Sequence, residues 1–493
     1  MHINDRKDIR NFVLDIEEKF NVNNWKFHNI HLWPFIRIML YFHLIFKIEQ
    51  ESKEDDLILA PAQPNPSPHY LKKLYYHLDT SRLFFKWLSS LKKVKYLFVG
   101  AFVHRTEFNG IFYNKFYDPL IKQYSISDFS LLEYEENKDI QISHDKKSIN
   151  FLYGFSLFKY YYRIKRKFRK PIHIKLEGYT DFINFLKSNP LTSDFAQQKS
   201  KEKILQYIND NLDIKYQFAS LIIKKIQPKY LFTLCYYHDF GMILTAVANK
   251  YNIPTIEMQH GPQTELHLAY SNWSQLPKSG YDALPRIYWN WDKDSAELIK
   301  KTFNRNSKYS SFIGGNPWLT FDFGKEMKEN TFILYTLQPK PLDVSALLSP
   351  NLLEVIKQSK YKWYLRFHPR QTKQEKEEIL RIIQDNFIND KVEYETANNY
   401  PLPLLLKNCI FNVTHFSGTT IEAELFNKKT VILNKIGKAA FENKISAGKA
   451  VYIDYNDTEF LATFLQFESS LNDHKEKEET YIDINAIEKI FNS

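Results

Sequence analysis

Cysteine is scarce in this chain of 493 residues, and metal-binding patterns are absent from its sequence. The two cysteines, Cys235 and Cys409, lie in apolar, strand-like runs, which favours buried, reduced thiols in a cytoplasmic protein over a disulfide framework. No Cys/His spacing typical of a metal site occurs, so we expect neither a metal nor a bound cofactor. These shortages argue against a disulfide-stabilised secreted protein and against a Cys/His metal module.

A long apolar run is also missing. The most apolar stretch, "LWPFIRIMLYFHLIF" at 32–46, is shorter than the roughly 20 residues that span a bilayer, and it contains Arg37 and His43. We interpret it as a buried or interfacial helix. The charged N-terminus has no signal-peptide pattern, so we expect a cytoplasmic protein, with peripheral attachment to the inner face of the cytoplasmic membrane left open.

The length of the chain exceeds what one hydrophobic core usually serves, so two or three domains are expected. Repeats of solenoid period and long low-complexity segments are absent, which argues against a repeat protein. The formal net charge of +10 suggests an anionic partner. Nucleic acid, a phosphorylated substrate and an acidic membrane surface are the alternatives.

The order of predicted elements divides the chain into three parts. Residues 1–90 are expected to be helical, apart from a Pro-containing loop at 60–70. Residues 91–320 form a first Rossmann-like domain with a basic helical insertion at about 155–225, and residues 321–493 form a second one. Strands and helices alternate in both, so we predict an α/β protein of two parallel sheets covered by helices.

Two strand ends of the second unit carry polar residues. "LYTLQP" ends in Thr336 and Gln338, and "YLRFHPR" ends in His368 and Arg370. Proline cannot donate to a sheet ladder, so this second strand must end before Pro369. In open α/β sheets, ligands bind at the carboxyl ends of the strands, which predicts a ligand contact for these side chains.

A third strand end, "NVTHFSGTTIEAE", leads directly into a helix. Ser417, Gly418, Thr419 and Thr420 lie at the predicted helix start, where free N–H groups and hydroxyls suit a phosphate. Glu422, one turn later, could accept hydrogen bonds from a ribose. Plain N-capping is the structural alternative for Ser417 and Thr419.

The strand ends of the first unit are rich in histidine and carboxylates. "YYHDFG" and "IEMQHGPQTE" are two of them, and "GAFVHRTEFNG" follows the first strand. A polar turn is the structural alternative for any one of these residues. The candidate side chains are His238, Asp239, Glu257, His260 and Glu265 at the two later ends, and His104, Arg105 and Glu107 at the first.

The order of "YNIPTIEMQHG", "IGGNP", "ILYTLQP", "LRFHPR" and "THFSGTTIEAELFNKKTVIL" resembles the GT-B glycosyltransferases of bacterial surface-polysaccharide assembly. The resemblance is strongest to the group whose His-Pro and Ser/Thr motifs bind a CMP-linked donor, as in sialyl- and Kdo-transferases. It covers about 230–435 well and 95–130 loosely. It implies two Rossmann-like domains facing across a cleft, and metal-independent transfer of a sugar from a nucleotide-sugar to a capsule, O-antigen or lipopolysaccharide glycan, free or lipid-linked.

The resemblance also implies roles for single residues. His368, Ser417 and Thr419 would contact the donor phosphate and Glu422 the ribose. Transfer requires a base for the acceptor hydroxyl and cationic or N–H groups for the departing phosphate. We expect Asp239 to be the base, with His238 and His260 as competitors. The remaining donor-binding residues would be Arg370, Gly418, Thr420, Gln338 and Thr336, and the acceptor-binding residues His104, Arg105, Glu107 and Glu265.

Two other functions remain open from the sequence. A CDP-polyol phosphotransferase of the teichoic acid type shares the His-Gly, His-Pro and Ser/Thr signals. A nucleic-acid-binding protein is suggested by "KYYYRIKRKFRK" at 159–170, where basic and aromatic residues interleave without an acidic partner between 159 and 176. Because no nucleic-acid motif occurs elsewhere, we expect this segment to serve an anionic membrane surface or the acceptor, and no nucleic acid to bind.

Overall fold

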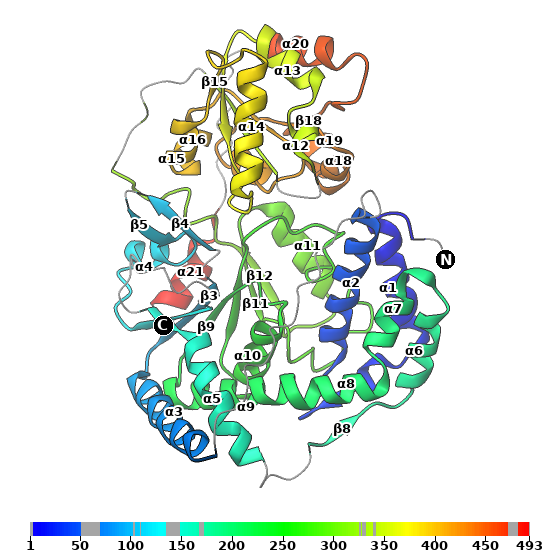
Figure 1. Ribbon diagram of the computed structural model, residues 1–493, viewed down its shortest axis with the longest axis vertical. Coiled ribbons are helices and arrows are strands. Elements are labelled where there is room, and N and C mark those ends of the chain that lie inside the picture. The colour runs from blue at the N-terminus through cyan, green and yellow to red at the C-terminus, as the bar shows by residue number, and fades with distance from the viewer. Residues whose placement is uncertain are drawn as a thin grey trace.

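The computed structural model describes residues 3–50, 70–101, 104–108, 110–134, 148–166, 172–324, 327, 332–338, 342–471 and 482–492. Nearly all of the predicted loop at 60–70 and most of a polar patch at 136–148 lie outside these residues. The described chain forms two α/β domains, one above the other in Figure 1.

A seven-stranded parallel sheet forms the centre of the N-terminal domain, in the order β12-β11-β10-β9-β3-β6-β7. The first strand, "YLFVGA", is buried almost throughout, as expected for a parallel strand covered on both faces. The strands are β3 (Tyr96–Ala101), β6 (Phe129–Tyr134), β7 (Ser148–Asn150), β9 (Tyr230–Leu234), β10 (Thr255–Met258), β11 (Ile287–Asn290) and β12 (Ser310–Ile313).

A six-stranded parallel sheet forms the centre of the C-terminal domain, in the order β15-β14-β13-β16-β17-β18. Counted along the chain, this is the doubly wound order 3-2-1-4-5-6, and the N-terminal sheet repeats it with one extra strand. The predicted α/β architecture of two Rossmann-like domains is confirmed. The strands are β13 (Phe332–Thr336), β14 (Lys362–Arg366), β15 (Val392–Glu393), β16 (Asn412–Thr414), β17 (Thr430–Ile432) and β18 (Ala450–Tyr452).

Helices cover both sheets (Figure 1). In the N-terminal domain these include α4 (Asp118–Gln123), α10 (Asp239–Lys250) and α11 (Lys293–Phe303). The helices of the C-terminal domain are α12 (Val344–Leu347), α13 (Pro350–Gln358), α14 (Lys373–Asp385), α15 (Glu395–Asn399), α16 (Leu402–Asn408), α17 (Thr419–Glu424), α18 (Lys435–Ala440), α19 (Glu442–Ser446) and α20 (Phe460–Ser470).

The N-terminal region and the predicted insertion pack against the same domain, because one apolar cluster runs from Ile9 through Trp33 and Phe182 to Ile243. The apolar run at 32–46 lies within the largely buried helix α2, as predicted. The helices are α1 (Arg6–Lys19), α2 (Trp33–Gln50), α3 (Tyr70–Ser90), α5 (Phe151–Arg166), α6 (Tyr179–Lys187), α7 (Pro190–Gln198), α8 (Lys201–Tyr207), a π-helix at Ile208–Leu212 and α9 (Asp213–Ile226).

The last helix, α21 (Ile484–Phe491), returns to the N-terminal domain, although the sequence placed 321–493 in the C-terminal one. The Phe491 ring stacks on Tyr124 with 4.6 Å between the centroids, and the Tyr96 hydroxyl donates to the Ile490 carbonyl at 3.1 Å. Such a contact between distant segments leaves no periodic signal in the sequence. The chain therefore crosses between the two domains twice.

A β-hairpin that we did not predict from the sequence follows β3. Strands β4 (Arg105–Phe108) and β5 (Ile111–Asn114) pair antiparallel, and Gly110 has φ of +73°. The Asn109-Gly110 dipeptide is a strong hairpin signal that we did not use. Three very short strands, β1 (Lys26–Phe27), β2 (Ile30–His31) and β8 (Ile174–Lys175), form a further small sheet that was also not predicted.

Candidate interdomain site

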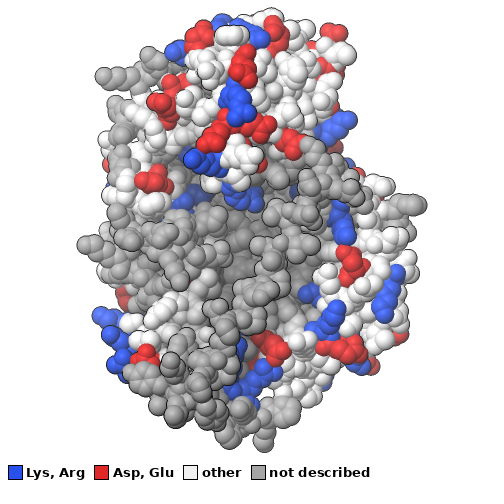
Figure 2. All heavy atoms as spheres, in the orientation of Figure 1, with Lys and Arg blue, Asp and Glu red and all other residues white. Residues whose placement is uncertain are grey.

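The carboxyl ends of the two sheets meet at the boundary between the domains. Each sheet changes its winding direction next to its first strand, β3 or β13, and such a switch point is where ligands bind in this class of sheet. A Cβ atom added to Gly418 would come within 3.1 Å of Pro262 in the other domain. Figure 2 shows Lys and Arg side chains along the edge of the C-terminal domain that faces the N-terminal domain.

Lys115 lies at the centre of this boundary, directly after the β4–β5 hairpin. Its charge interacts with His104 and His260 of its own domain and with Arg366, His368 and Glu422 of the other. Burial lowers the pKa of Lys115, and the charge of Glu422 acts in the opposite direction. No carboxylate of the described residues lies within ion-pair distance of its ammonium group. Lys115 is thus a cation available to an anionic ligand.

Arg366 adds a second cation from the C-terminal domain. One guanidinium nitrogen, Nη1, donates to the carbonyls of Ala397 and Tyr400, at 2.5 and 2.6 Å, which fixes the side chain at the end of β14. Burial lowers the pKa of Arg366 to about 10, so the group remains charged at neutral pH. Two cations from different domains therefore lie within electrostatic range of one another.

Glu422, expected at the ribose, is buried at the same boundary. Burial raises its pKa, although Lys115 and Arg366 act in the opposite direction. Its Oε1 accepts from Nδ2 of Asn316 at 3.3 Å, so its observed partner lies on the connection between the domains. Its side chain is close to the two cations and therefore to any ligand that they hold.

Three histidines accept a backbone N–H at Nδ1, which places their proton on Nε2. Nδ1 of His104 accepts from Ala101 at 3.1 Å, Nδ1 of His368 from Arg370 at 3.1 Å and Nδ1 of His238 from Gly241 at 3.4 Å. Burial lowers the pKa of His368 and of His238 to about 4, and that of His104 well below its usual value. At neutral pH their Nε2 atoms are therefore hydrogen-bond donors.

His260 has the opposite arrangement. Its Nδ1 lies 3.4 Å from the carbonyl of Met258 and 3.6 Å from Oε1 of Glu257, so Nδ1 carries the proton and Nε2 the lone pair. Nε2 is 3.2 Å from the hydroxyl of Tyr237. Burial lowers the pKa of His260 to about 4. Of these four histidines, His260 is the one whose Nε2 can accept a proton.

Glu257, whose Oε1 lies 3.6 Å from Nδ1 of His260, is fully buried on β10. Burial raises its pKa to about 8, although Thr233, the backbone N–H of Tyr236 and Tyr270 supply hydrogen bonds that lower it. The carboxyl group is therefore protonated at neutral pH. It fixes the end of β10 and with it the position of His260.

The residues at the start of α17 are largely engaged within the protein. The hydroxyl of Ser417 accepts from the Thr419 N–H at 3.3 Å, which is the capping alternative. The Thr419 hydroxyl lies 2.9 Å from that of Thr336, and both residues are nearly buried. The Thr420 hydroxyl is buried and has no hydrogen-bond partner among the described residues.

The other two predicted donor-binding residues differ in exposure. Gln338 follows β13 and is 4% exposed, whereas Arg370 is exposed beyond β14. Pro339, which completes the first motif, lies outside the described residues.

Asp239 does not belong to the group around Lys115. It is the first residue of α10, whose N-cap is His238. Its carboxylate forms an ion pair with Lys215 at 2.7 Å and accepts from Tyr207 at 2.6 Å and Asn211 at 3.0 Å. Burial acts to raise the pKa of Asp239, but Lys215 and the Tyr207 hydroxyl outweigh it and lower the pKa. This carboxylate is consequently engaged in contacts within the N-terminal domain.

Of the four residues predicted to bind the acceptor, His104 belongs to the group around Lys115, and the other three do not. Arg105 has a buried side chain that forms an ion pair with Glu133 at 2.7 Å and donates to the Phe112 carbonyl at 2.6 Å, which is a structural role. Glu107 is exposed on the hairpin. Glu265 pairs with Lys301 at 2.7 Å, and both side chains are more than half exposed.

Two residues of the site, Lys115 and Arg366, were missed from the sequence. Lys115 follows a hairpin that we did not predict, and Arg366 precedes the His-Pro motif by only two residues. Glu257 was noted in a polar cluster, but nothing in the sequence indicated that it would be completely buried beside His260. The hairpin signal Asn109-Gly110 could have pointed to Lys115.

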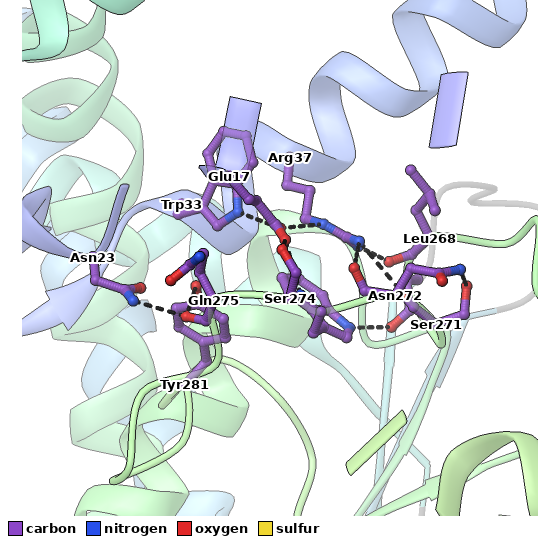
Figure 3. Close-up of polar contacts among 12 residues, drawn as sticks. Glu17, Asn23, Trp33, Arg37, Leu268, Ser271, Asn272, Ser274, Gln275 and Tyr281 are labelled. Atoms are coloured by element: carbon purple, nitrogen blue, oxygen red, sulfur yellow. Dashed lines mark hydrogen bonds and ion pairs between the residues drawn. The ribbon is translucent and has the colours of Figure 1, made fainter. Parts of the chain in front are cut away.

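The segment 268–275, which follows His260 in the chain, contacts the N-terminal region (Figure 3). Arg37 of α2 is fully buried and pairs with Glu17 of α1 at 2.9 Å. Its guanidinium also donates to the carbonyls of Leu268, Ser271 and Asn272. The charge within the apolar run of α2 therefore organises the chain that follows His260.

The predicted basic segment is only partly described. Lys159, Arg163 and Lys165 lie on α5, and positions 167–171 are outside the described residues. Arg166 has an acidic partner after all, because Asp210 lies 2.8 Å away across the helices. The window from 159 to 176 was too short to include that contact.

The two cysteines differ in exposure. Cys409 is buried, whereas Cys235 is partly exposed, contrary to our expectation of two buried thiols. Within the described residues, no cluster of His, Cys, Asp and Glu could hold a metal ion. None of the described helices has the length and apolar character needed to cross a bilayer.

Comparison with known proteins gives neither a matching family model nor a matching curated sequence. Among solved structures, the chain is similar to the UDP-GlcNAc 2-epimerase of Methanocaldococcus jannaschii in complex with UDP-GlcNAc and UDP, at 11% identity and a TM-score of 0.47, over 80% of this chain and 98% of that one. It is also similar to S. aureus MnaA with UDP, at 12% identity and 0.46, over 81% and 97%. The Medicago truncatula UGT71G1 complexed with UDP-glucose is similar at 9% identity and a TM-score of 0.41, over 81% of this chain and 93% of that one.

The strand orders and the facing carboxyl ends of the two sheets define the class of architecture. Two doubly wound domains meet at their switch points, and the last helix packs back on the first domain. The chain has the GT-B fold.

Proposed function

We propose that the protein is a glycosyltransferase that binds a nucleotide-sugar between its two domains. The observation that carries the proposal is the position of Lys115. This cation, without an ion-pair partner among the described residues, lies within electrostatic range of Arg366 and of His368. Cations and N–H donors from two domains at a pair of sheet switch points suit a phosphate group.

The geometry supports a division of labour between the domains. Lys115, Arg366 and the Nε2–H of His368 would bind the donor phosphate and stabilise the charge that develops on it. Nε2 of His260 would take the proton of the acceptor hydroxyl. The acceptor oxygen then forms a bond to the anomeric carbon, the bond from this carbon to the phosphate oxygen breaks, and its electron pair leaves with the nucleotide.

The nature of the two substrates follows from the motif resemblance. The His-Pro and Ser/Thr motifs favour a CMP-sugar as the donor, and the same resemblance favours a growing capsule, O-antigen or lipopolysaccharide glycan as the acceptor. Such acceptors are assembled at the cytoplasmic face of the membrane. The lysine and arginine side chains of α5 would suit peripheral attachment to anionic lipids there.

A nucleotide-binding panel with a Lys115→Met variant tests this function. In a thermal-shift series with CMP, CDP, UDP and GDP, one nucleotide should stabilise the wild-type protein, and Lys115→Met should weaken its affinity about tenfold or more, because it loses a charge-assisted contact. Lys93→Met, at an exposed lysine of the same domain, is the matched control.

Two results would contradict the proposal. If no nucleotide stabilises the protein, or if Lys115→Met binds as well as Lys93→Met does, the interdomain site is not a nucleotide site. Product analysis decides the type of transfer: a glycosidic product supports the glycosyltransferase, whereas a new phosphodiester shows the polyol phosphotransferase.

A further inference from the structure

A separate pocket of about 600 Å³ lies beside the interdomain site, between α2, α7 and the start of α10. Its volume is in the range of ligand pockets and large enough for a sugar residue. The helices that form its walls belong to the N-terminal region and to the insertion. None of the three residues of the proposed donor site lines this pocket; these residues are Lys115, Arg366 and His368.

Aromatic rings form much of the pocket wall. Phe42 stacks on Tyr237 with 5.9 Å between the ring centroids, and Phe42 is 41% exposed although it is a large apolar residue. The rest of the apolar lining comes from the buried rings of Phe195 and Phe240 and from Ile38 and Met39. An exposed aromatic ring such as that of Phe42, beside polar groups, suits a sugar ring, which has an apolar face and polar hydroxyls.

The charged groups of the pocket have an excess of cations. Lys215 is neutralised by Asp239 at 2.7 Å. Lys199 also lines the pocket, but its ammonium lies 4.9 Å from the centroid of the Tyr207 ring and has no ion pair among the described residues. The charge of Asp239 also acts on Lys199, but Asp239 forms its ion pair with Lys215. The pocket lining therefore keeps one ammonium group that can bind an anion.

The pocket is connected to the proposed base through one side chain. Tyr237 lines the pocket, and its hydroxyl lies 3.2 Å from Nε2 of His260. A sugar held against Phe42 and Tyr237 would therefore be connected to the proposed proton acceptor through the side chain of Tyr237.

From this arrangement we infer that the pocket binds an acidic sugar of the acceptor glycan, with its carboxylate or phosphate on Lys199 and its ring on Phe42. The assignment to the acceptor rests on the proposed glycosyl transfer, whereas binding of the acid can be measured without a donor. A sugar carboxylate and a sugar phosphate present the same chemistry to an ammonium group, so both are used as probes.

The test is a binding titration of the full chain with glucuronate, glucose 6-phosphate and glucose. At least one of the two acids should bind about tenfold or more tightly than glucose, and Lys199→Gln should remove this preference. The control is Lys203→Gln, at an exposed lysine on α8, which should retain it. Phe42→Ala, a change at a half-exposed position, should weaken all three sugars and gives a second readout if Lys199→Gln does not fold.

The outcomes separate this inference from the proposed function. If the three sugars bind equally, or if the preference for an acid survives in Lys199→Gln, the inference is wrong. Nucleotide binding is measured on the same preparations. A protein that binds a nucleotide but shows no preference for acids keeps its proposed function and loses only this pocket assignment.

Discussion

At the scale of single residues, hydrogen bonding to the backbone separates side chains that look equivalent in the sequence. His104, His238, His260 and His368 all follow strand ends, and all have a lowered pKa because they are buried. Which ring nitrogen keeps its lone pair depends on whether the other one faces an N–H or a carbonyl. Only His260 faces a carbonyl through Nδ1, and this makes it our choice as the base.

His260→Gln should therefore lower turnover by about 100-fold or more, which is the usual contribution of a general base. Glutamine keeps a polar group near the hydroxyl of Tyr237 but cannot take the proton. Nucleotide binding should remain at the wild-type level, because His260 does not contact the phosphate in this scheme. Steady-state kinetics combined with a thermal shift in the preferred nucleotide measures both quantities.

Asp239→Asn is the matched comparison, since the sequence favoured Asp239 as the base. In the structure its carboxylate is paired with Lys215, so the variant should lose stability through that ion pair and retain most of its turnover. A 100-fold loss in Asp239→Asn together with normal turnover in His260→Gln would return the role of base to Asp239.

The sequence identified these residues as candidates, but it could not show which of them is placed to act as the base. Strand ends followed by histidine were visible as a pattern, whereas tautomers depend on atoms a few residues away in space. Arg105 illustrates the same limit, because its partner Glu133 comes from the neighbouring strand β6 and turns a candidate ligand contact into an internal ion pair.

At the scale of secondary-structure elements, periodicity predicted the strands and helices of both sheets well, because parallel strands are short apolar runs and their covering helices are amphipathic. Boundaries were less accurate: the strand that the sequence requires to end before Pro369 already ends at Arg366. Helix α2 shows why a polar residue in an apolar run matters. Arg37, which argued against a membrane span, is the group that binds α2 to α1 and to the segment after His260.

Arg37→Met should destabilise the protein strongly, because it leaves the carboxylate of Glu17 buried without a cationic partner, with hydrogen bonds from Trp33 and Ser274 only. Breaking one side of a buried ion pair costs about 3–5 kcal/mol, and removing both charges with Glu17→Gln should recover part of this loss. Urea unfolding of the two variants measures the difference. Arg82→Met, which breaks an exposed pair with Asp79, is the control and should unfold like the wild type. Equal stability of Arg37→Met and Arg82→Met would show that the buried pair does not support α2.

At the scale of the whole molecule, the two domains are joined by contacts that the sequence does not reveal. The apolar cluster that contains Phe232 and Trp289 continues to Ile432 and Phe441 in the other domain, and α21 returns to the first sheet. Such contacts join positions that are hundreds of residues apart and leave no local pattern. The site between the domains therefore depends on how firmly these contacts hold the two parts together.

Lys444 is the polar centre of that interface. It is nearly buried on α19, and its Nζ lies 2.6 Å from Glu424 of its own domain, 2.9 Å from Asp294 and 3.7 Å from Asp292 of the other. Burial acts to lower the pKa of Lys444, but the three carboxylates outweigh this effect and raise it. Without the ammonium group, these carboxylates would repel one another across the interface.

Lys444→Met should consequently let the domains separate when no nucleotide is bound. We expect a larger radius of gyration in small-angle X-ray scattering than for the control Lys429→Met, which changes an exposed position on the same domain. The affinity for the nucleotide should be several-fold weaker, because the nucleotide must then close the domains as well as bind. Asp294→Asn removes one contact with less disturbance and should show the same change to a smaller degree. If both variants keep the radius and the affinity of Lys429→Met, the apolar cluster alone holds the domains, and Lys444 has no part in assembling the site.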